Sequence, residues 1–182
     1  PGVALWNLNI LGHALSNMIS ETEIREELSK YESHLLTTYS DLMRSKLGLK
    51  KHKTEDRALL GELLAIMQVN QADYTIVWRT LSEITDFANE QQRFVDLFLN
   101  REQAQTWLNK YRARLNFEST TPQARSAAMC SVNPKFILRN YLAQEAIEQA
   151  EQGNLEKLMT LYQILKAPFA EQPHYQDYAK HP

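Results

Sequence analysis

The segment Asn133–Gly153 has the sequence NPKFILRNYLAQEAIEQAEQG and shows most clearly what kind of fold to expect. It opens with asparagine and proline, a pair typical of a helix start, and it closes with Gly153, which is typical of a helix end. Between these signals apolar residues recur at spacings of three and four, as on one face of a helix. The predicted buried set is Phe136, Ile137, Tyr141, Leu142, Ile147 and Ala150. No catalytic pair is apparent on this helix, so the pattern indicates scaffold.

The first quarter of the chain repeats the helical periodicity. A helix is expected from about Ala4 to Ile19, and Ser20 with Glu23 fits the capping box that starts the next one. That second helix is expected to run until Gly48 ends it. The inner face predicted for the first helix contains Trp6, Ile10, Leu11, Ala14 and Met18. The seam predicted for the second contains Ile24, Leu28, Tyr31, Leu35, Tyr39, Leu42 and Lys46.

The rest of the chain continues in the same way. Further helices are expected after Thr54, after Asp73, in residues 86–99 and 101–115, from Pro122, and after Asn154 until Pro168. No segment shows sustained alternation of apolar and polar residues, which a half-buried strand would require. The prediction is an all-α fold, a single compact domain of about eight helices over residues 1–182, with an irregular tail at 168–182.

Composition limits the possible partners. The 20 Lys and Arg residues against 22 Asp and Glu leave a formal charge of -2, which gives no broad positive field for nucleic acid. The basic cluster KLGLKKHK at Lys46–Lys53 could touch phosphate, but a solvated loop is the favoured interpretation. No apolar run approaches the roughly 20 residues that span a bilayer, and the opening PGVALWNLNILGHALSNMI lacks a basic leader. Neither nucleic acid nor a membrane is an expected partner, and the Pro-Gly start favours a cut from a longer chain.

Residue types that carry catalysis or bind metals form no recognisable motif. Glycine-rich phosphate loops, zinc-protease helices and nucleophile elbows are absent from the sequence. The single cysteine, Cys130, excludes an intrachain disulfide and a cysteine zinc site, and is expected to be a small buried group. The five histidines never pair at ligand spacing. His13 is expected to be a hydrogen-bonded core residue rather than a catalytic base.

Several polar and aromatic residues admit a functional and a structural interpretation. Arg139, among apolar neighbours, favours a structural ion pair over a substrate contact. The carboxylate pair Glu55 and Asp56, like Glu26 and Glu27, favours a solvated face or a helix-dipole contact. The larger aromatic residues favour core packing over stacking platforms for bases, because no basic stripe accompanies them. They are Trp6, Tyr31, Tyr39, Trp78, Trp107 and Tyr141.

Five segments together resemble one family, and they are spread over essentially all 182 residues. These are QARSAAMCSVNPKFILRNYLAQEAIEQAEQGNLEKL, PFAEQPHYQDYAKHP, DYTIVWRTL, MRSKLGL and the opening PGVALWNLNILGHAL. They are similar to the C-terminal part of the selenoprotein O family. The asparagine-proline segment and the EQPHYQDYA tail are its most specific features.

The resemblance implies a protein with a kinase-like fold that transfers AMP from ATP to hydroxyl side chains of proteins, using magnesium or manganese. It places the family's nucleotide-binding and metal-binding residues before PGVALWNL, so no catalytic, cofactor-binding or metal residue is expected here. The implied partners are the missing N-terminal kinase-like region and the protein substrates. The implied compartment is the cytoplasm in a bacterium or the mitochondrion in a eukaryote. The family's C-terminal cysteine or selenocysteine lies beyond this sequence, and Cys130 does not correspond to it.

Two function hypotheses follow. In the first, the chain is the helical scaffold portion of an adenylyltransferase and is inactive alone. In the second, it is an independent helical protein-interaction module. The reading frame upstream distinguishes them, because only the first requires a kinase-like nucleotide site there.

Overall fold

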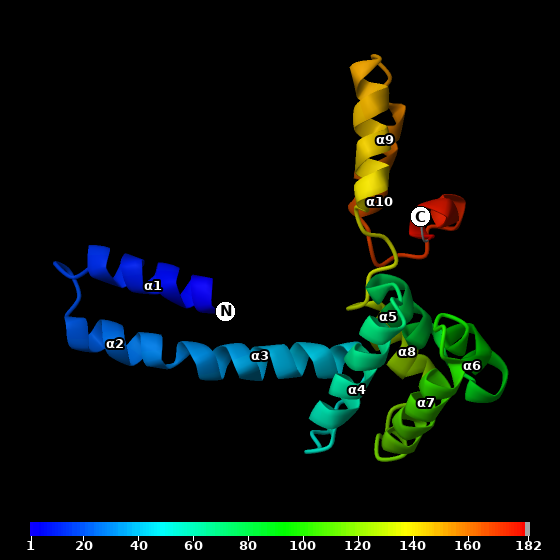
Figure 1. The fold of residues 1–182 in the computed structure, drawn as a ribbon, viewed down its shortest axis with the longest axis horizontal. Coiled ribbons are helices and arrows are strands. Elements are labelled where there is room, and N and C mark those ends of the chain that lie inside the picture. Colours follow the sequence, from blue (N-terminus) through cyan, green and yellow to red (C-terminus); the bar gives the residue numbers. More distant parts are fainter. Residues whose placement is uncertain (181–182) are drawn as a thin grey trace. The chain divides into compact units, whose positions relative to one another are not determined.

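The computed structural model describes residues 1–180, and in this part of the chain loops connect helices and there is no strand (Figure 1). It contains ten α-helices and one short 3-10 helix, η1. The all-α prediction is therefore confirmed. By its internal packing the chain divides into two units, Pro1–Met43 and the remainder from Arg44 onward. That residues 1–182 act as one domain stays a prediction.

The N-terminal unit contains α1 (Gly2–Ala14), α2 (Glu21–Ser29) and most of α3 (Tyr31–Lys46). Gly12 lets α1 approach α2 closely, because a Cβ at this position would lie 2.6 Å from Cγ2 of Ile24. The predicted capping box is present at the start of α2. The backbone N–H of Glu23 donates to Ser20 Oγ (3.3 Å), and that of Ser20 donates to Glu23 Oε2 (3.2 Å).

Three predictions for this unit were wrong. The first helix ends at Ala14 instead of Ile19, and the long second helix is interrupted at Lys30. The predicted inner face of α1 and part of the α3 seam are exposed: Trp6, Ile10, Leu11, Ala14, Met18, Tyr39 and Leu42. The spacing correctly identified apolar faces, but α2 covers only the strip of α1 around Gly12. Periodicity cannot show whether a neighbouring element exists to cover a face.

The unit that starts at Arg44 is built around five helices. These are α4 (Asp56–Val69), α5 (Tyr74–Glu83), α6 (Phe87–Val95), α7 (Arg101–Leu115) and α8 (Pro122–Cys130). Helix α5 packs on α8, and α4 on α7. An aromatic stack fills the centre, with the ring of Trp107 5.7 Å from Phe94 and 5.3 Å from Tyr111. On α4, Leu59, Leu63 and Met67 are buried, and Leu60 and Leu64 are half-buried.

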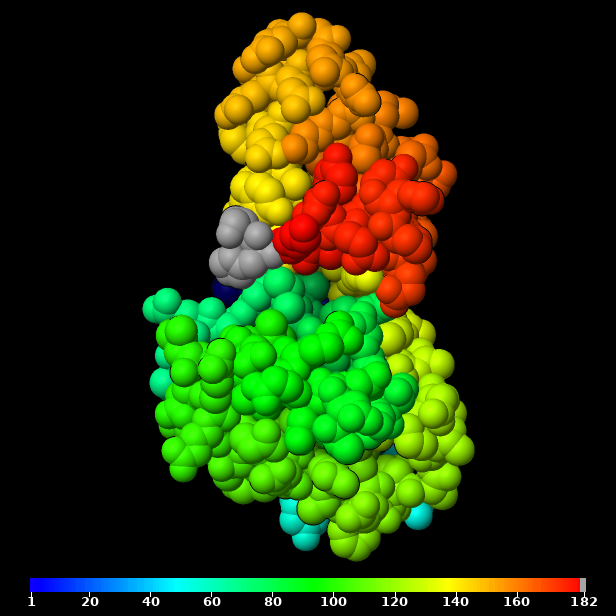
Figure 2. All heavy atoms as spheres, turned by 90° about the vertical axis from the view of Figure 1, so that its right-hand side faces the viewer, coloured from blue at the N-terminus to red at the C-terminus, as the bar shows by residue number. Residues whose placement is uncertain are grey.

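Helices α9 (Asn140–Glu151) and α10 (Glu156–Leu165) pack side by side as a hairpin (Figure 1). Gly153 has the positive φ of 84° expected after a helix end, and Asn154 Oδ1 accepts the backbone N–H of Glu156 (2.9 Å). Leu142, Ala146 and Leu161 form the core of the hairpin. The C-terminal segment, including η1 (Pro173–Ala179), lies between this hairpin and helices α5 to α8 (Figure 2). Residues 181 and 182 of the predicted irregular tail lie outside the described residues.

The prediction that Asn133 and Pro134 start a helix was wrong. Helix α9 begins at Asn140, and residues 134–139 are not helical. The backbone N–H groups of Lys135 and Phe136 donate to Pro168 O at 2.8 and 3.1 Å, so this stretch is tied to the chain that follows α10. Of the predicted buried set, Phe136 and Leu142 are buried, Ile137, Tyr141 and Ala150 are half-buried, and Ile147 is exposed.

Candidate functional site

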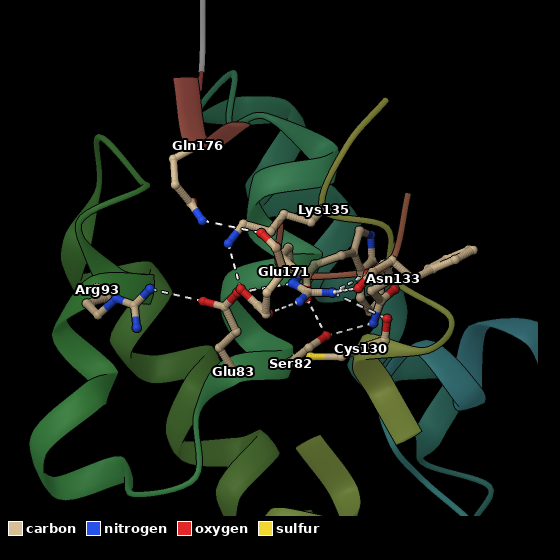
Figure 3. A network of polar contacts seen from close by, with 11 residues as sticks. Ser82, Glu83, Arg93, Cys130, Asn133, Lys135, Glu171 and Gln176 are labelled. Carbon is tan, nitrogen blue, oxygen red and sulfur yellow. Dashed lines mark hydrogen bonds and ion pairs between the residues drawn. The ribbon is translucent and has the colours of Figure 1, made fainter. Parts of the chain in front are cut away.

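Figure 3 shows the most extensive polar network in the described chain, which includes Glu83, Asn133 and Glu171. The residue that joins these groups is Arg79 on α5. Its Nε donates to Glu83 Oε1 (3.0 Å) and its Nη2 to Glu171. Its Nη1 donates to three main-chain oxygens, those of Cys130 (3.3 Å), Asn133 (3.2 Å) and Phe169 (3.1 Å). One buried guanidinium therefore joins α5, the end of α8 and the C-terminal segment.

The carboxylates around Arg79 each meet a second cation. Glu171 Oε2 accepts from Lys135 Nζ (2.7 Å), and Glu83 Oε2 accepts from Arg93 Nη2 (3.0 Å). The hydrogen bond from Lys135, with the charge of Arg79, lowers the pKa of Glu171. Burial opposes the positive charge of Arg79, but the charges and hydrogen bonds of its neighbours outweigh this and raise its pKa. Both shifts favour the charged forms of Arg79 and Glu171.

Asn133 forms the second part of the network and is fully buried. Its Nδ2 donates to Lys46 O (3.0 Å) and to Ser82 Oγ (2.9 Å), while its Oδ1 accepts from Lys46 Nζ (2.8 Å). The Lys46 ammonium also lies over two aromatic rings, 5.7 Å from the centre of Tyr74 and 5.4 Å from that of Trp78. Burial lowers the pKa of Lys46. Asn133 therefore joins the ends of α3 and α5 instead of capping a helix.

A second ionic cluster surrounds Arg114 on α7. Its Nε and Nη2 donate to both oxygens of Asp56 (2.5 and 3.2 Å), and its Nη1 donates to Glu118 Oε1 (2.9 Å). Glu118 also accepts the backbone N–H groups of Lys50 and Lys51 at 3.2 to 3.3 Å. Of the two interpretations of Asp56, the solvated face was wrong, because Arg114, far along the chain, encloses this carboxylate. Its position in the first turn of α4 fits the helix-dipole contact. Residues 50–53 of the basic cluster are exposed, as the solvated-loop interpretation required.

The chemistry of both clusters is that of closed ion pairs. The oxygens of Glu83, Glu171 and Asp56 face guanidinium or ammonium groups, so a divalent cation placed there would meet positive charge. No group of three or more His, Cys, Asp or Glu residues that could hold a metal occurs within residues 1–180. The half-buried Cys130 has its pKa raised, chiefly by burial, which disfavours the thiolate nucleophile. These donor sets fit positioning of the chain and do not fit a nucleotide-metal centre.

The structure decides between the structural and functional interpretations of Arg139, His13 and the large aromatic residues. Arg139 Nη1 donates to Asp73 Oδ2 (2.6 Å), which confirms a structural ion pair. His13 is exposed, so its prediction as a core histidine was wrong. Trp78 and Trp107 are core residues as predicted, whereas Trp6 and Tyr39 are exposed.

Sequence reasoning did not identify Arg79, Asn133 and Glu171 as partners. The available signal was Arg79 itself, a charged residue within the apolar run YTIVWRTL, which needs a partner when buried. Asn133 was interpreted as a cap because asparagine before proline has that local preference. Glu171, 92 residues away from Arg79, carried no local signal at all.

The comparisons with known proteins identify the family of the chain. A family model described as "Protein adenylyltransferase SelO" matches residues 1–166. The chain belongs to this family. The match ends just after α10, so Phe169 and Glu171 of the network lie beyond it, in a segment that the individual relatives still cover.

The relatives are bacterial proteins named "Protein nucleotidyltransferase YdiU". Those of Yersinia pseudotuberculosis and Vibrio parahaemolyticus are 42% identical over 182 and 188 residues, and that of Pseudoalteromonas atlantica is 39% identical over 182. Each alignment covers 100% of this chain and 38% of the relative. The chain thus spans a little over a third of the length of these proteins, and the resemblance to the selenoprotein O family is confirmed. Within residues 1–180, no helix is both long enough and apolar enough to cross a membrane.

Proposed function

We propose that this chain is the C-terminal helical scaffold of a protein adenylyltransferase, which transfers AMP from ATP to hydroxyl side chains of other proteins. The family match over residues 1–166 and the partial coverage of longer relatives support this. In this proposal the reacting groups belong to the N-terminal kinase-like region, which binds ATP with magnesium or manganese. The scaffold and that region are partners within one protein, and the substrates are other proteins.

The observation that carries the scaffold role is the closure of the Arg79 and Arg114 clusters. Nucleotidyl transfer needs cations directed at the phosphates and carboxylates directed at the metal. Here both guanidinium groups bind carboxylates and main-chain oxygens of the chain itself. We therefore assign no catalytic, cofactor-binding or metal residue to this chain. Its contribution is to hold other groups in register, and removing it would inactivate the enzyme indirectly.

The proposed compartment is the cytoplasm, because the relatives compared are bacterial. The alternative, an independent helical interaction module, requires an upstream reading frame unrelated to a kinase-like fold. Sequencing that frame separates the two proposals.

The direct test compares the 182-residue chain with the full-length protein. Each is incubated with labelled ATP, magnesium or manganese, and an acceptor protein. We expect label transfer by the full-length protein and none by the chain above a control without protein. Transfer by the chain alone would refute the scaffold assignment.

A further inference from the structure

Helix α1 is apolar on nearly every side. Between Gly2 and Ala14 it has no Asp, Glu, Lys or Arg residue. Only Gly12 is buried, at the contact with α2. The large apolar side chains that are exposed are Val3, Trp6, Leu8, Ile10 and Leu11. Its polar side chains are Asn7, Asn9 and His13. A helix with so much apolar surface is normally buried, so α1 lacks the cover its composition requires.

The exposed side chains include a compact stripe, which we call the α1 surface: Val3, Trp6 and Ile10. At about 100° per residue these three lie within about 60° of each other around the helix, and Gly12 lies opposite Val3. The α1 surface therefore faces away from α2. Trp6 is 64% exposed, whereas Trp78 and Trp107 are almost completely buried.

Helix α2 has the opposite character. Its outward residues include Glu21, Arg25, Glu26 and Glu27, and the first two form an exposed ion pair (3.5 Å). These charges suit contact with water. The missing cover therefore belongs on the far side of α1, and the absence of charge there requires an apolar partner surface.

We propose that the α1 surface docks onto the N-terminal kinase-like region of the same protein, with Trp6 as its anchor. This inference rests on the proposed function, which places that region before this chain. Since the chain covers 38% of its relatives, the remainder of such a protein is larger than the chain itself. Under the proposed function that region precedes this chain, so α1 is the first helix that follows it along the sequence. Large aromatic side chains are the usual anchors of such contacts.

The experiment is covalent footprinting by hydroxyl radicals, read out by mass spectrometry, on the 182-residue chain and on the full-length protein. An added tryptophan peptide calibrates the radical dose. In the 182-residue chain we expect Trp6 to be modified and Trp78 to be protected. In the full-length protein the modification of Trp6 should fall to the level of Trp78.

A pair of variants in the full-length protein tests the anchor. Trp6→Ser should leave Ile10 open to modification, whereas Leu36→Ser, at an exposed site on α3, should leave Ile10 protected. Continued protection of Trp78 in both variants shows that they fold.

Three outcomes overturn the inference. The first is equal modification of Trp6 in the two proteins. The second is protection of Trp6 in the 182-residue chain that grows with concentration, which identifies a second copy as the occupant. The third is protection at every concentration, which identifies another part of this chain. AMP transfer is measured separately, so a full-length protein without activity but with protected Trp6 contradicts only the proposed function.

Discussion

Helices α1 and α7 show that the composition of a helix does not decide how much of it is buried. The sequence of α1, GVALWNLNILGHA, is far more apolar than that of α7, REQAQTWLNKYRARL. Yet α7 buries Ala104, Trp107, Leu108, Tyr111 and Arg114, while α1 buries only Gly12. Helix α7 packs against α4 and α6, whereas the main packing partner of α1 is the short helix α2. Burial, and the stability it supplies, depends on the neighbours that the fold provides.

The largest expected difference between the two units is the loss of unfolding free energy when a tryptophan is replaced by alanine. Trp107 stacks on two aromatic rings and its Nε1 donates to Leu59 O (2.8 Å). Trp107→Ala should lower the unfolding free energy of the 182-residue chain by about 4 kcal/mol, because it leaves a cavity and removes the hydrogen bond to Leu59 O. Trp6→Ala should change it by less than about 0.5 kcal/mol. Urea unfolding followed by far-ultraviolet circular dichroism measures both, and equal losses would contradict the contrast.

The next largest difference in stability is expected between a buried and an exposed arginine. Arg114→Ala leaves the carboxylates of Asp56 and Glu118 buried without their cation, so we expect a loss of about 3 kcal/mol. The matched change in the N-terminal unit is Arg25→Ala, whose ion pair with Glu21 is exposed. It should have no measurable effect on stability. Denaturant unfolding of the two variants sharpens the comparison, and a tolerated Arg114→Ala would show that the buried cluster is dispensable.

A smaller difference in stability is expected for two leucines. The sequence pattern predicts that both lie on the inner face of a helix. Leu142 on α9 is 4% exposed and Leu42 on α3 is 61% exposed. Leu142→Ala should cost about 2.5 kcal/mol and Leu42→Ala less than about 0.5 kcal/mol. Tyr141 is half-buried beside Leu142, so the stability loss of Tyr141→Ala should lie between those of the two leucine variants. Thermal unfolding of the three variants would reveal a reversed order if the hairpin opens in solution.

The smallest expected effect is a change in the pKa of one carboxylate in each unit. The pKa of Glu23 is lowered by hydrogen bonds from Ser20, and that of Glu171 by Lys135 and then Arg79. The contribution of Glu171 to stability is therefore complete above the ordinary glutamate pKa and is lost as pH falls through its lowered pKa.

Carbon-detected NMR titration follows the two carboxylates separately. Ser20→Ala should return Glu23 toward its ordinary pKa and leave Glu171 unchanged, and Lys135→Met should do the reverse. A variant that shifts both carboxylates would show that the two contacts are not independent.

Local chemistry determined much of the secondary structure. The capping box at Ser20, the aspartate cap at Asp73, the threonine before Pro122 and the glycine after α9 act through neighbours a few residues away, and all are present. Asn133 is the instructive exception. Its local preference indicated a helix start, but its side chain binds Lys46 and Ser82, which are 87 and 51 residues away. Partners at such distances leave no periodic trace in a single sequence.

The sequence by itself determined that the chain is helical, where most helices begin, and to which family it belongs, because caps, periodicity and residue identity are local properties. Only the tertiary structure decided which apolar faces are covered. Trp107 and Trp6 occupy comparable apolar positions in their helices, and one is enclosed while the other is exposed. Only the tertiary structure brought Glu171 to Arg79 and Asp56 to Arg114. The physical reason is that burial and ion pairing depend on groups distant in sequence, whose approach is set by the packing of whole helices.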